Sequence, residues 1–136
     1  MLSRAVRLGY AAANRGDFDV VLVGLDPAFE YLPAEGLRPP DLETVFRGHE
    51  GYVQLWRYWL DAFGDIHWDP EELFDFGDQM LVTTHQRGHG LGSGVAVSEP
   101  VFQLYQLRGG LIVRHEDFLD RSKALDAAAS RPPVQH

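Results

Sequence analysis

Hydrophobic and polar residues alternate between positions 111 and 119 in the pattern of a β-strand with one buried face. Because successive side chains of a strand point to opposite faces, one face carries Leu111, Val113, His115, Asp117 and Leu119. The aliphatic residues predict that this face belongs to the core. A carboxyl group beside an imidazole is costly there unless the two groups are paired or used. His115 and Asp117 are therefore the first candidate functional residues.

Three more strands are predicted before this one, over residues 66–76, 79–89 and 95–107. Turn residues separate the strands, at 77–78, at 90–94 and at Gly109-Gly110. Pro70 lies inside the first of them and predicts a bulge or a sheet edge, because proline cannot donate a ladder hydrogen bond. Strands that follow one another in this way predict an antiparallel meander.

The spacing of apolar residues predicts four helices, over residues 3–14, 18–25, 51–63 and 122–129. The third is the clearest, because Tyr52, Trp56, Trp59 and Phe63 follow one another at helical spacing. This aromatic stripe is expected to pack on the sheet, and Trp56 and Trp59 are also candidate walls of a pocket. Tyr31, on a short strand predicted over 28–32, is a further candidate for the wall.

The order of these elements predicts an α+β fold with a single domain over residues 1–130. Its curved sheet, antiparallel or mixed, is expected to form a cone, with the helices packed on the concave face and a pocket enclosed between them. Residues 33–41 contain three prolines and a glycine and are predicted to form a loop at the rim. Residues 131–136 are predicted to be a poorly ordered tail.

The loop between the last two strands decides which side chains face His115 and Asp117. If its two glycines form a two-residue hairpin turn, Leu104 lies opposite His115 and Phe102 lies opposite Asp117. That register scatters the polar residues of the preceding strand.

A three-residue loop over 108–110 predicts a different register. Gln103 then faces His115, and Tyr105 lies on the same side of the sheet. We prefer this second register because it gathers Gln103, Tyr105, His115 and Asp117 where they can satisfy one another.

The strand over 79–89 has no fixed register, because the connection that follows it is glycine-rich. His85 is predicted as its inward polar residue, and Thr84 or Gln86 takes that place if the register slips by one. A surface position for His85 stays open, since solvent-facing histidines are common on strands.

Composition and charge narrow the classes of function. The net charge is −8, and the arginine and lysine residues are scattered, which argues against nucleic-acid binding. The chain has no cysteine, and no pair of histidines has the spacing of a zinc site, so neither a metal nor a cofactor is expected. No window approaches the ~20 apolar residues of a membrane span. With no sign of a signal peptide, these observations predict a cytoplasmic protein without membrane contacts.

Five segments carry a family resemblance: residues 13–17, the strand after Asp26-Pro27, residues 46–51, residues 77–78 and residues 110–120. Together they span nearly the whole chain, and they resemble the SnoaL-like polyketide cyclases of the nuclear transport factor two-like superfamily. The resemblance implies the cone-shaped fold and a small hydrophobic or polyketide-like ligand. In the cyclases an aspartate on the last strand is the general acid/base, and the matching residue is Asp117. A histidine of that group falls on Gln103, which cannot shuttle a proton.

Other branches of the superfamily match less well. The general base of the ketosteroid isomerases falls on Leu32, which has no acid/base chemistry. Their tyrosine on the first helix falls near Gly9, and Tyr10 is turned from that direction by about 100°. The strand over 95–107 lacks the Arg-x-Asp pattern of the limonene epoxide hydrolases.

Two hypotheses follow for the function. In the first, the protein is an acid/base enzyme of the isomerase, cyclase or lyase type, in which Asp117 exchanges a proton with a carbonyl ligand and His115 orients or partners it. The ligand-binding residues are then Gln103, Tyr105, Trp56, Tyr31, Trp59 and His85. In the second, the same fold binds a ligand without turnover or serves dimerisation. A homodimer is expected in either case, through an outer sheet face that carries Ile112, Arg114 and Phe118.

Overall fold

The computed structural model describes residues 4–34, 45–63, 65–90, 94 and 96–130. Its helices are α1 (Arg4–Asn14), α2 (Phe18–Val23), α3 (Gly48–Ala62) and α4 (Arg121–Ser130). Its strands are β1 (Leu25–Leu32), β2 (Phe46–Arg47), β3 (His67–Asp75), β4 (Gln79–His89), β5 (Ala96–Arg108) and β6 (Leu111–Phe118). None of the described helices is long and apolar enough to cross a lipid bilayer.

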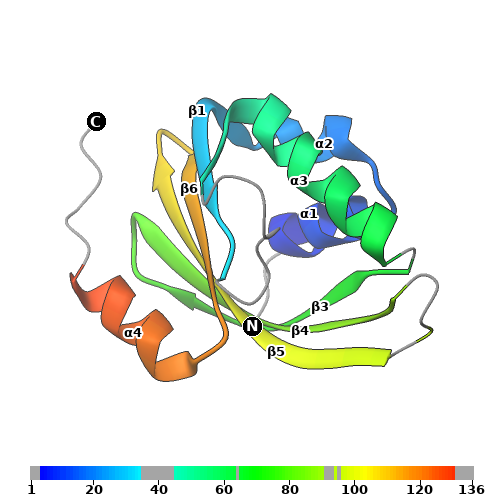
Figure 1. Cartoon of the computed structure of the whole chain (residues 1–136). Helices are drawn as coiled ribbons and strands as arrows, with labels where there is room; N and C mark the ends of the chain where they lie inside the picture. The colour runs from blue at the N-terminus through cyan, green and yellow to red at the C-terminus, as the bar shows by residue number, and fades with distance from the viewer. Residues whose placement is uncertain (1–3, 35–44, 64, 91–93, 95, 131–136) are drawn as a thin grey trace.

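The strands form one strongly curved sheet in the order β2-β1-β6-β5-β4-β3 (Figure 1). The predicted antiparallel meander from β3 to β6 is confirmed, and the register of β3 shifts between Pro70 and Glu72, as the proline predicted. β1 pairs in parallel with β6, and β2 pairs antiparallel with β1. The short strand β2 was not predicted. The predicted rim loop, beyond Ala34, and the tail over 131–136 lie outside the described residues.

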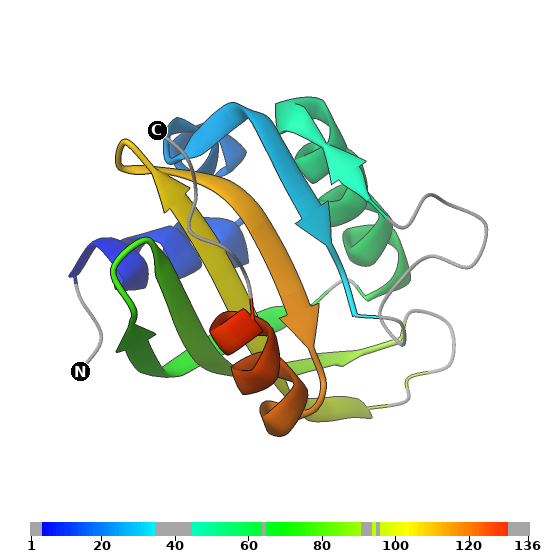
Figure 2. The same ribbon diagram turned by 90° about the vertical axis from the view of Figure 1, so that its left-hand side faces the viewer.

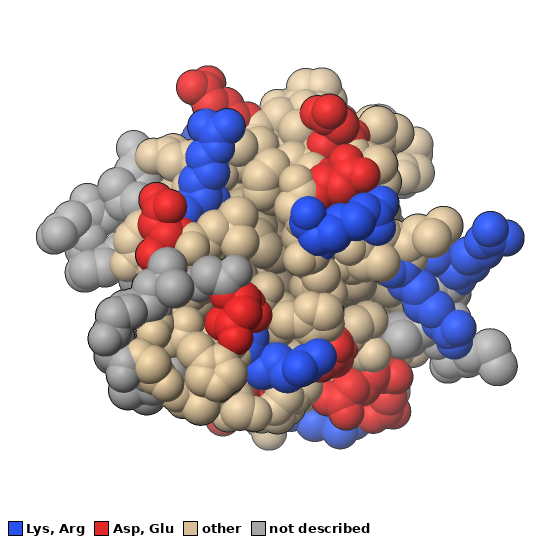
Figure 3. Space-filling view, turned by 90° about the vertical axis from the view of Figure 1, so that its right-hand side faces the viewer, with Lys and Arg blue, Asp and Glu red and all other residues tan. Residues whose placement is uncertain are grey.

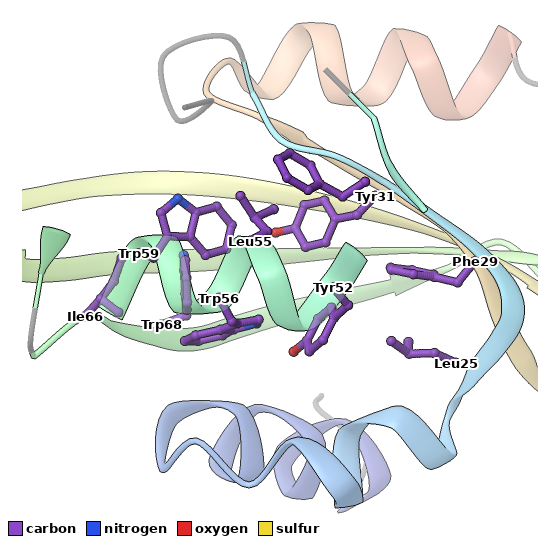
Figure 4. Close-up of a cluster of buried hydrophobic side chains, with 10 residues drawn as sticks. Leu25, Phe29, Tyr31, Tyr52, Leu55, Trp56, Trp59, Ile66 and Trp68 are labelled. Carbon is purple, nitrogen blue, oxygen red and sulfur yellow. The ribbon is translucent and has the colours of Figure 1, made fainter. Parts of the chain in front are cut away.

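The aromatic stripe of α3 lies in the main core, between the helix and the concave face of the sheet (Figure 4). The rings of Trp56 and Trp68 meet edge to face at 4.6 Å, and the ring of Trp59 lies 5.1 Å from that of Trp68. Leu55, on the same helix, has no exposed surface. Burial of these large side chains fixes α3 against the concave face of the sheet, because large aromatic rings remove much apolar area from water.

Helix α4 packs on the opposite, outer face of the sheet, where it covers β4, β5 and β6 (Figure 2). The prediction that all helices share the concave face is therefore wrong for α4. The physical reason is a second apolar cluster on the outer face, where Ala124 of α4 meets Leu81 and Leu104. Exposed aliphatic residues on these strands require a cover, and the last helix provides it.

The prediction that Ile112 and Phe118 form an outer sheet face for a homodimer is wrong. Phe118 packs into the cluster beneath α4, and Ile112 lies against the main core on the other side of the sheet. Self-association stays a prediction, and light scattering over a dilution series is its test.

On another face of the molecule, acidic and basic side chains are interspersed (Figure 3).

β5 and β6 pair in neither of the two predicted registers. The pairing begins as a two-residue hairpin, with Arg108 opposite Leu111, and then shifts by one residue between Gln106 and Leu107. After this shift Tyr105 lies opposite His115 and Gln103 lies opposite Asp117. The irregularity also turns Ile112 toward the core, because an extra residue in one strand reverses the alternation beyond it.

Candidate functional site

A cavity of about 520 Å³ lies between α1, α2, α3 and the concave face of the sheet. Its aromatic lining residues are Tyr10, Phe29, Tyr31, Tyr52, Trp56, Trp68 and Tyr105. Aliphatic side chains from both ends of the chain complete the wall, among them Val6, Leu25 and Ile112. A cavity of this size, with few polar groups, suits a small and largely hydrophobic ligand.

The polar groups of the cavity gather at one end. Tyr10, Gln103, Tyr105 and His115 all line the wall there. They come from α1, β5 and β6, which the sheet and the first helix bring together from opposite ends of the sequence. Asp117 lies behind this group and does not line the cavity.

Asp117 accepts three hydrogen bonds from neighbouring side chains. His115 Nε2 lies 2.7 Å from Oδ1, Gln103 Nε2 donates to Oδ1 at 3.1 Å, and the Tyr31 hydroxyl donates to Oδ2 at 2.7 Å. The Asp117 side chain is only 1% exposed. A buried carboxylate needs such donors, because burial without them is costly. Three of its acceptor positions are therefore used within the protein, and the carboxylate does not reach the cavity.

His115 is held between two tyrosine rings. Its ring centroid lies 3.9 Å from that of Tyr31 and 4.4 Å from that of Tyr105. The planes of these two tyrosine rings are tilted from the imidazole plane by 30° and 33°. Nε2 is the ring nitrogen that bonds Asp117. In the described part of the chain, no hydrogen-bond partner is recorded for Nδ1. Since a carboxylate can only accept, the neutral ring carries its proton on Nε2, and Nδ1 is left with a lone pair.

The orientation of the Gln103 amide follows from Asp117. Its nitrogen donates to the carboxylate, so its oxygen faces the other way, toward the tyrosines. Tyr10 donates to that oxygen, and the hydroxyl of Tyr105 lies 3.3 Å from it. The two hydroxyls are 2.8 Å apart. The network is continuous from His115 through Asp117 and Gln103 to Tyr10.

Burial raises the pKa of Tyr10, Tyr31, Tyr52 and Tyr105 above their ordinary value of 10.0, and the nearby Asp117 charge raises it further. These four hydroxyls therefore stay protonated in the folded protein. The unfolded chain releases their protons from about pH 10 upward, so it binds fewer protons than the folded protein in that range. We predict that the free energy of unfolding falls steeply above about pH 10 and is unaffected by these groups below it.

Urea unfolding at a series of alkaline pH values measures this effect, with tyrosinate absorbance recorded on the folded protein. The absorbance of the four buried tyrosines is expected to appear only with the loss of the near-ultraviolet circular dichroism. Ionisation of these tyrosines while the native signal persists contradicts their burial.

Five of the eight predicted site residues line the cavity: Tyr31, Trp56, Gln103, Tyr105 and His115. Trp59 is 3% exposed and packs behind Tyr31, so it supports the wall without forming it. Asp117 also stands behind the wall.

The prediction for His85 is wrong. Its side chain faces the other side of β4 and lies 2.5 Å from the Ser98 hydroxyl. Thr84 and Gln86, the alternatives, are both buried, at 1% and 4% exposure. Gln86 accepts a hydrogen bond from the indole of Trp68, which places it beneath the cavity wall. The sequence of the connection after β4 contains no signal that fixes the register of this strand. The packing of Trp68 against Gln86 decides the register instead.

Tyr10 is a polar site residue that the sequence did not indicate. Its helical spacing with Val6 and Ala13 marked it as a core residue, and its hydroxyl in fact reaches the polar end of the cavity. Among the described residues, no group of three His, Asp or Glu side chains has an arrangement that could hold a metal ion.

The curved sheet, the helices on its concave face and the enclosed cavity define a cone-shaped α+β pocket protein. The chain belongs to the SnoaL-like domain family, whose model matches residues 6–115. This confirms the resemblance inferred from the sequence. No curated protein matches the chain.

Solved structures with the same fold cover nearly the whole chain. TerC, crystallised with polyporic acid, is 22% identical, with 93% of this chain and 96% of that chain covered and a TM-score of 0.75. An NTF2-like protein of unknown function from Burkholderia pseudomallei is 22% identical, with 90% and 93% covered and a TM-score of 0.77. IdmH from Streptomyces antibioticus, a proposed polyketide cyclase, is 19% identical, with 92% and 96% covered and a TM-score of 0.71. At these identities the likeness shows the fold.

Proposed function

We propose that the protein is an acid/base enzyme that moves a proton on a small, hydrophobic, carbonyl-containing ligand, and that His115 is the residue that meets the ligand. The observation that carries the proposal is the pairing of His115 with Asp117. The imidazole lies on the cavity wall, and its Nε2 is 2.7 Å from a carboxylate buried behind it. This arrangement orients the ring and stabilises its protonated form.

In this mechanism His115 Nδ1 takes a proton from the carbon next to the ligand carbonyl. The C–H bond breaks, an N–H bond forms, and the electron pair passes into an enolate. Asp117 stays ionised and stabilises the imidazolium across the 2.7 Å contact. His115 then returns the proton to the ligand, so the net reaction is an isomerisation or an intramolecular ring closure. The role predicted for Asp117 as the direct acid/base passes to His115, because the carboxylate is committed to three donors.

The cavity supports the choice of ligand. Its lining is mostly aromatic and aliphatic, with a group of polar side chains around Gln103 and His115, which suits a ligand with a hydrophobic body and one polar end. A structural relative crystallised with polyporic acid supports a small organic ligand of this kind. The alternative function is ligand binding without turnover, which the same cavity also allows.

Proton exchange in heavy water separates the two functions without knowledge of the product. Carbonyl compounds that stabilise the protein in a thermal-shift screen are incubated with it in heavy water, and the loss of the proton signal next to the carbonyl is followed by NMR. The enzyme hypothesis predicts exchange well above the buffer rate for at least one compound that binds. Binding with exchange only at the buffer rate supports the non-catalytic alternative.

A further inference from the structure

Tyr52 adds a hydroxyl to the cavity wall, beside the network that surrounds Asp117. The residue is only 5% exposed, and its hydroxyl points away from the backbone of α3 toward α1 and α2, whose residues also line the cavity (Figure 4). Its ring packs among aromatic neighbours, with the ring centroids of Phe18 and Phe29 each 6.2 Å away. A phenylalanine would fill that space equally well, so the buried hydroxyl requires an explanation.

The other tyrosine hydroxyls on the wall give their hydrogens to the protein. Tyr31 donates to Asp117. Tyr10 donates to Gln103 Oε1. Tyr105 lies 2.8 Å from the Tyr10 oxygen and 3.3 Å from Gln103 Oε1, so its hydrogen has an acceptor in either direction. A ligand carbonyl can draw none of these hydrogens without breaking a bond that the protein already has.

No acceptor is recorded among the described residues for the hydroxyl hydrogen of Tyr52. The indole of Trp56 hydrogen-bonds this hydroxyl, and because an indole nitrogen only donates, the Tyr52 oxygen is the acceptor. Burial raises the pKa of Tyr52 and the bond from Trp56 opposes the rise without cancelling it, so the hydroxyl keeps its hydrogen. That hydrogen is therefore available to an acceptor in the cavity.

Tyr52 lies close to the residues that hold His115. Its ring centroid is 6.4 Å from that of Tyr31, which in turn is 3.9 Å from the centroid of the imidazole. Burial is the main cause of the raised pKa of Tyr31 and Tyr105, and a charge on Tyr52 raises both further. Because such interactions weaken with distance, the three hydroxyls share one region of the cavity. A carbonyl bound to Tyr52 is then near the imidazole.

We infer that Tyr52 donates a hydrogen bond to the carbonyl oxygen of the ligand, where it stabilises the enolate as a second catalytic residue. This rests on the proposed function, which assigns the proton transfer to His115. As the C–H bond next to the carbonyl breaks and the proton passes to His115, the electron pair moves onto the carbonyl oxygen. The hydrogen bond from Tyr52 strengthens as that oxygen becomes negative, and Tyr52 keeps its own proton. Return of the first proton to the ligand restores the neutral imidazole.

Methyl β-naphthyl ketone, isotope-labelled at its carbonyl carbon, tests the contact directly. Its infrared carbonyl stretch in the whole protein is expected at lower frequency than in hexane, because a hydrogen bond weakens the C=O bond. Tyr52→Phe is expected to return the stretch toward the hexane value. Tyr58→Phe, on the exposed side of α3 and outside the cavity lining, is the matched control and keeps the wild-type frequency.

Affinity and rate separate a catalytic role of Tyr52 from a packing role. By titration calorimetry, Tyr52→Phe is expected to weaken ketone binding roughly 3- to 10-fold, the effect of one hydrogen bond. Binding of β-ethylnaphthalene, which has no carbonyl, is expected to stay unchanged. The rate of methyl proton exchange on the bound ketone in heavy water is expected to fall by roughly 100-fold, since removal of one such donor commonly has that effect.

A carbonyl stretch that Tyr52→Phe leaves in place overturns the inference and leaves the proposed function standing, because another donor then holds the carbonyl. Equal loss of affinity for the ketone and the hydrocarbon also overturns it, since Tyr52 then acts only through packing. A shift of the stretch that Tyr52→Phe abolishes supports the contact, and exchange only at the buffer rate in the wild-type protein then overturns the proposed proton transfer alone. Failure of the ketone to bind at millimolar concentration overturns both.

Discussion

His115→Gln is expected to lower the rate of proton exchange on a bound carbonyl compound by roughly 100-fold or more, since a positioned acid or base commonly contributes that much. The glutamine amide can still donate to Asp117 from a similar position, so the buried carboxylate keeps a partner. It has no group that gains and releases a proton near neutral pH. The substitution therefore removes the proton transfer while leaving the hydrogen bond behind it.

His85→Gln is the matched control for this variant. His85 bonds Ser98 and lies outside the cavity lining, so its substitution is expected to leave the exchange rate unchanged. NMR in heavy water measures both variants against the wild-type protein with one ligand. Exchange by His115→Gln at the wild-type rate, with ligand binding retained, excludes His115 as the base.

Asp117→Asn is expected to lower the free energy of unfolding by about 1 to 3 kcal/mol, the cost of leaving one buried polar group unsatisfied. The asparagine oxygen can still accept from His115 and Gln103 if it takes the place of Oδ1. Its nitrogen then takes the place of Oδ2, where the Tyr31 hydroxyl now donates at 2.7 Å. Two donors face each other at this point, and one of the two hydrogens is left without an acceptor.

A double-mutant cycle with Tyr31→Phe isolates that contact. In the wild-type protein Tyr31→Phe removes a hydrogen bond to a carboxylate, and in the Asp117→Asn background it removes a conflict, so its cost is expected to be smaller there. Urea unfolding measures all four proteins, and Asp61→Asn, exposed on α3, is the surface control. Costs that add within about 0.5 kcal/mol contradict a stabilising bond between Tyr31 and Asp117.

The sequence predicted which polar side chains meet in the site, although it did not predict the pairing register of β5 and β6. The preferred register and the observed one differ by two residues, and a shift of two leaves every side chain on its face. Gln103, Tyr105, His115 and Asp117 therefore meet as predicted. The irregularity between Gln106 and Leu107 decides the true pairing. It leaves no local mark in the sequence, because the glycines before it also fit a regular hairpin.

The approach of α1 to the sheet decided the rest of the site. Tyr10 and Gln103 are 93 residues apart in the chain, and their contact depends on how the first helix packs against β3 and the rest of the sheet. Helical periodicity identifies the buried face of a helix, but it does not distinguish one residue on that face from another. Which of them reaches a polar partner depends on the position and rotation of the helix, which are properties of the packed core.

The sequence by itself determined which residues of this protein share a buried face, since strand alternation and helical spacing are local properties of the chain. It thereby placed His115 beside Asp117 on β6 and Trp56 in the wall of the cavity. Only the tertiary structure decided that His115 lines the cavity while Asp117 stands behind it, and that α4 covers the outer face. These outcomes depend on contacts between residues far apart in the chain, and local sequence patterns do not predict such contacts.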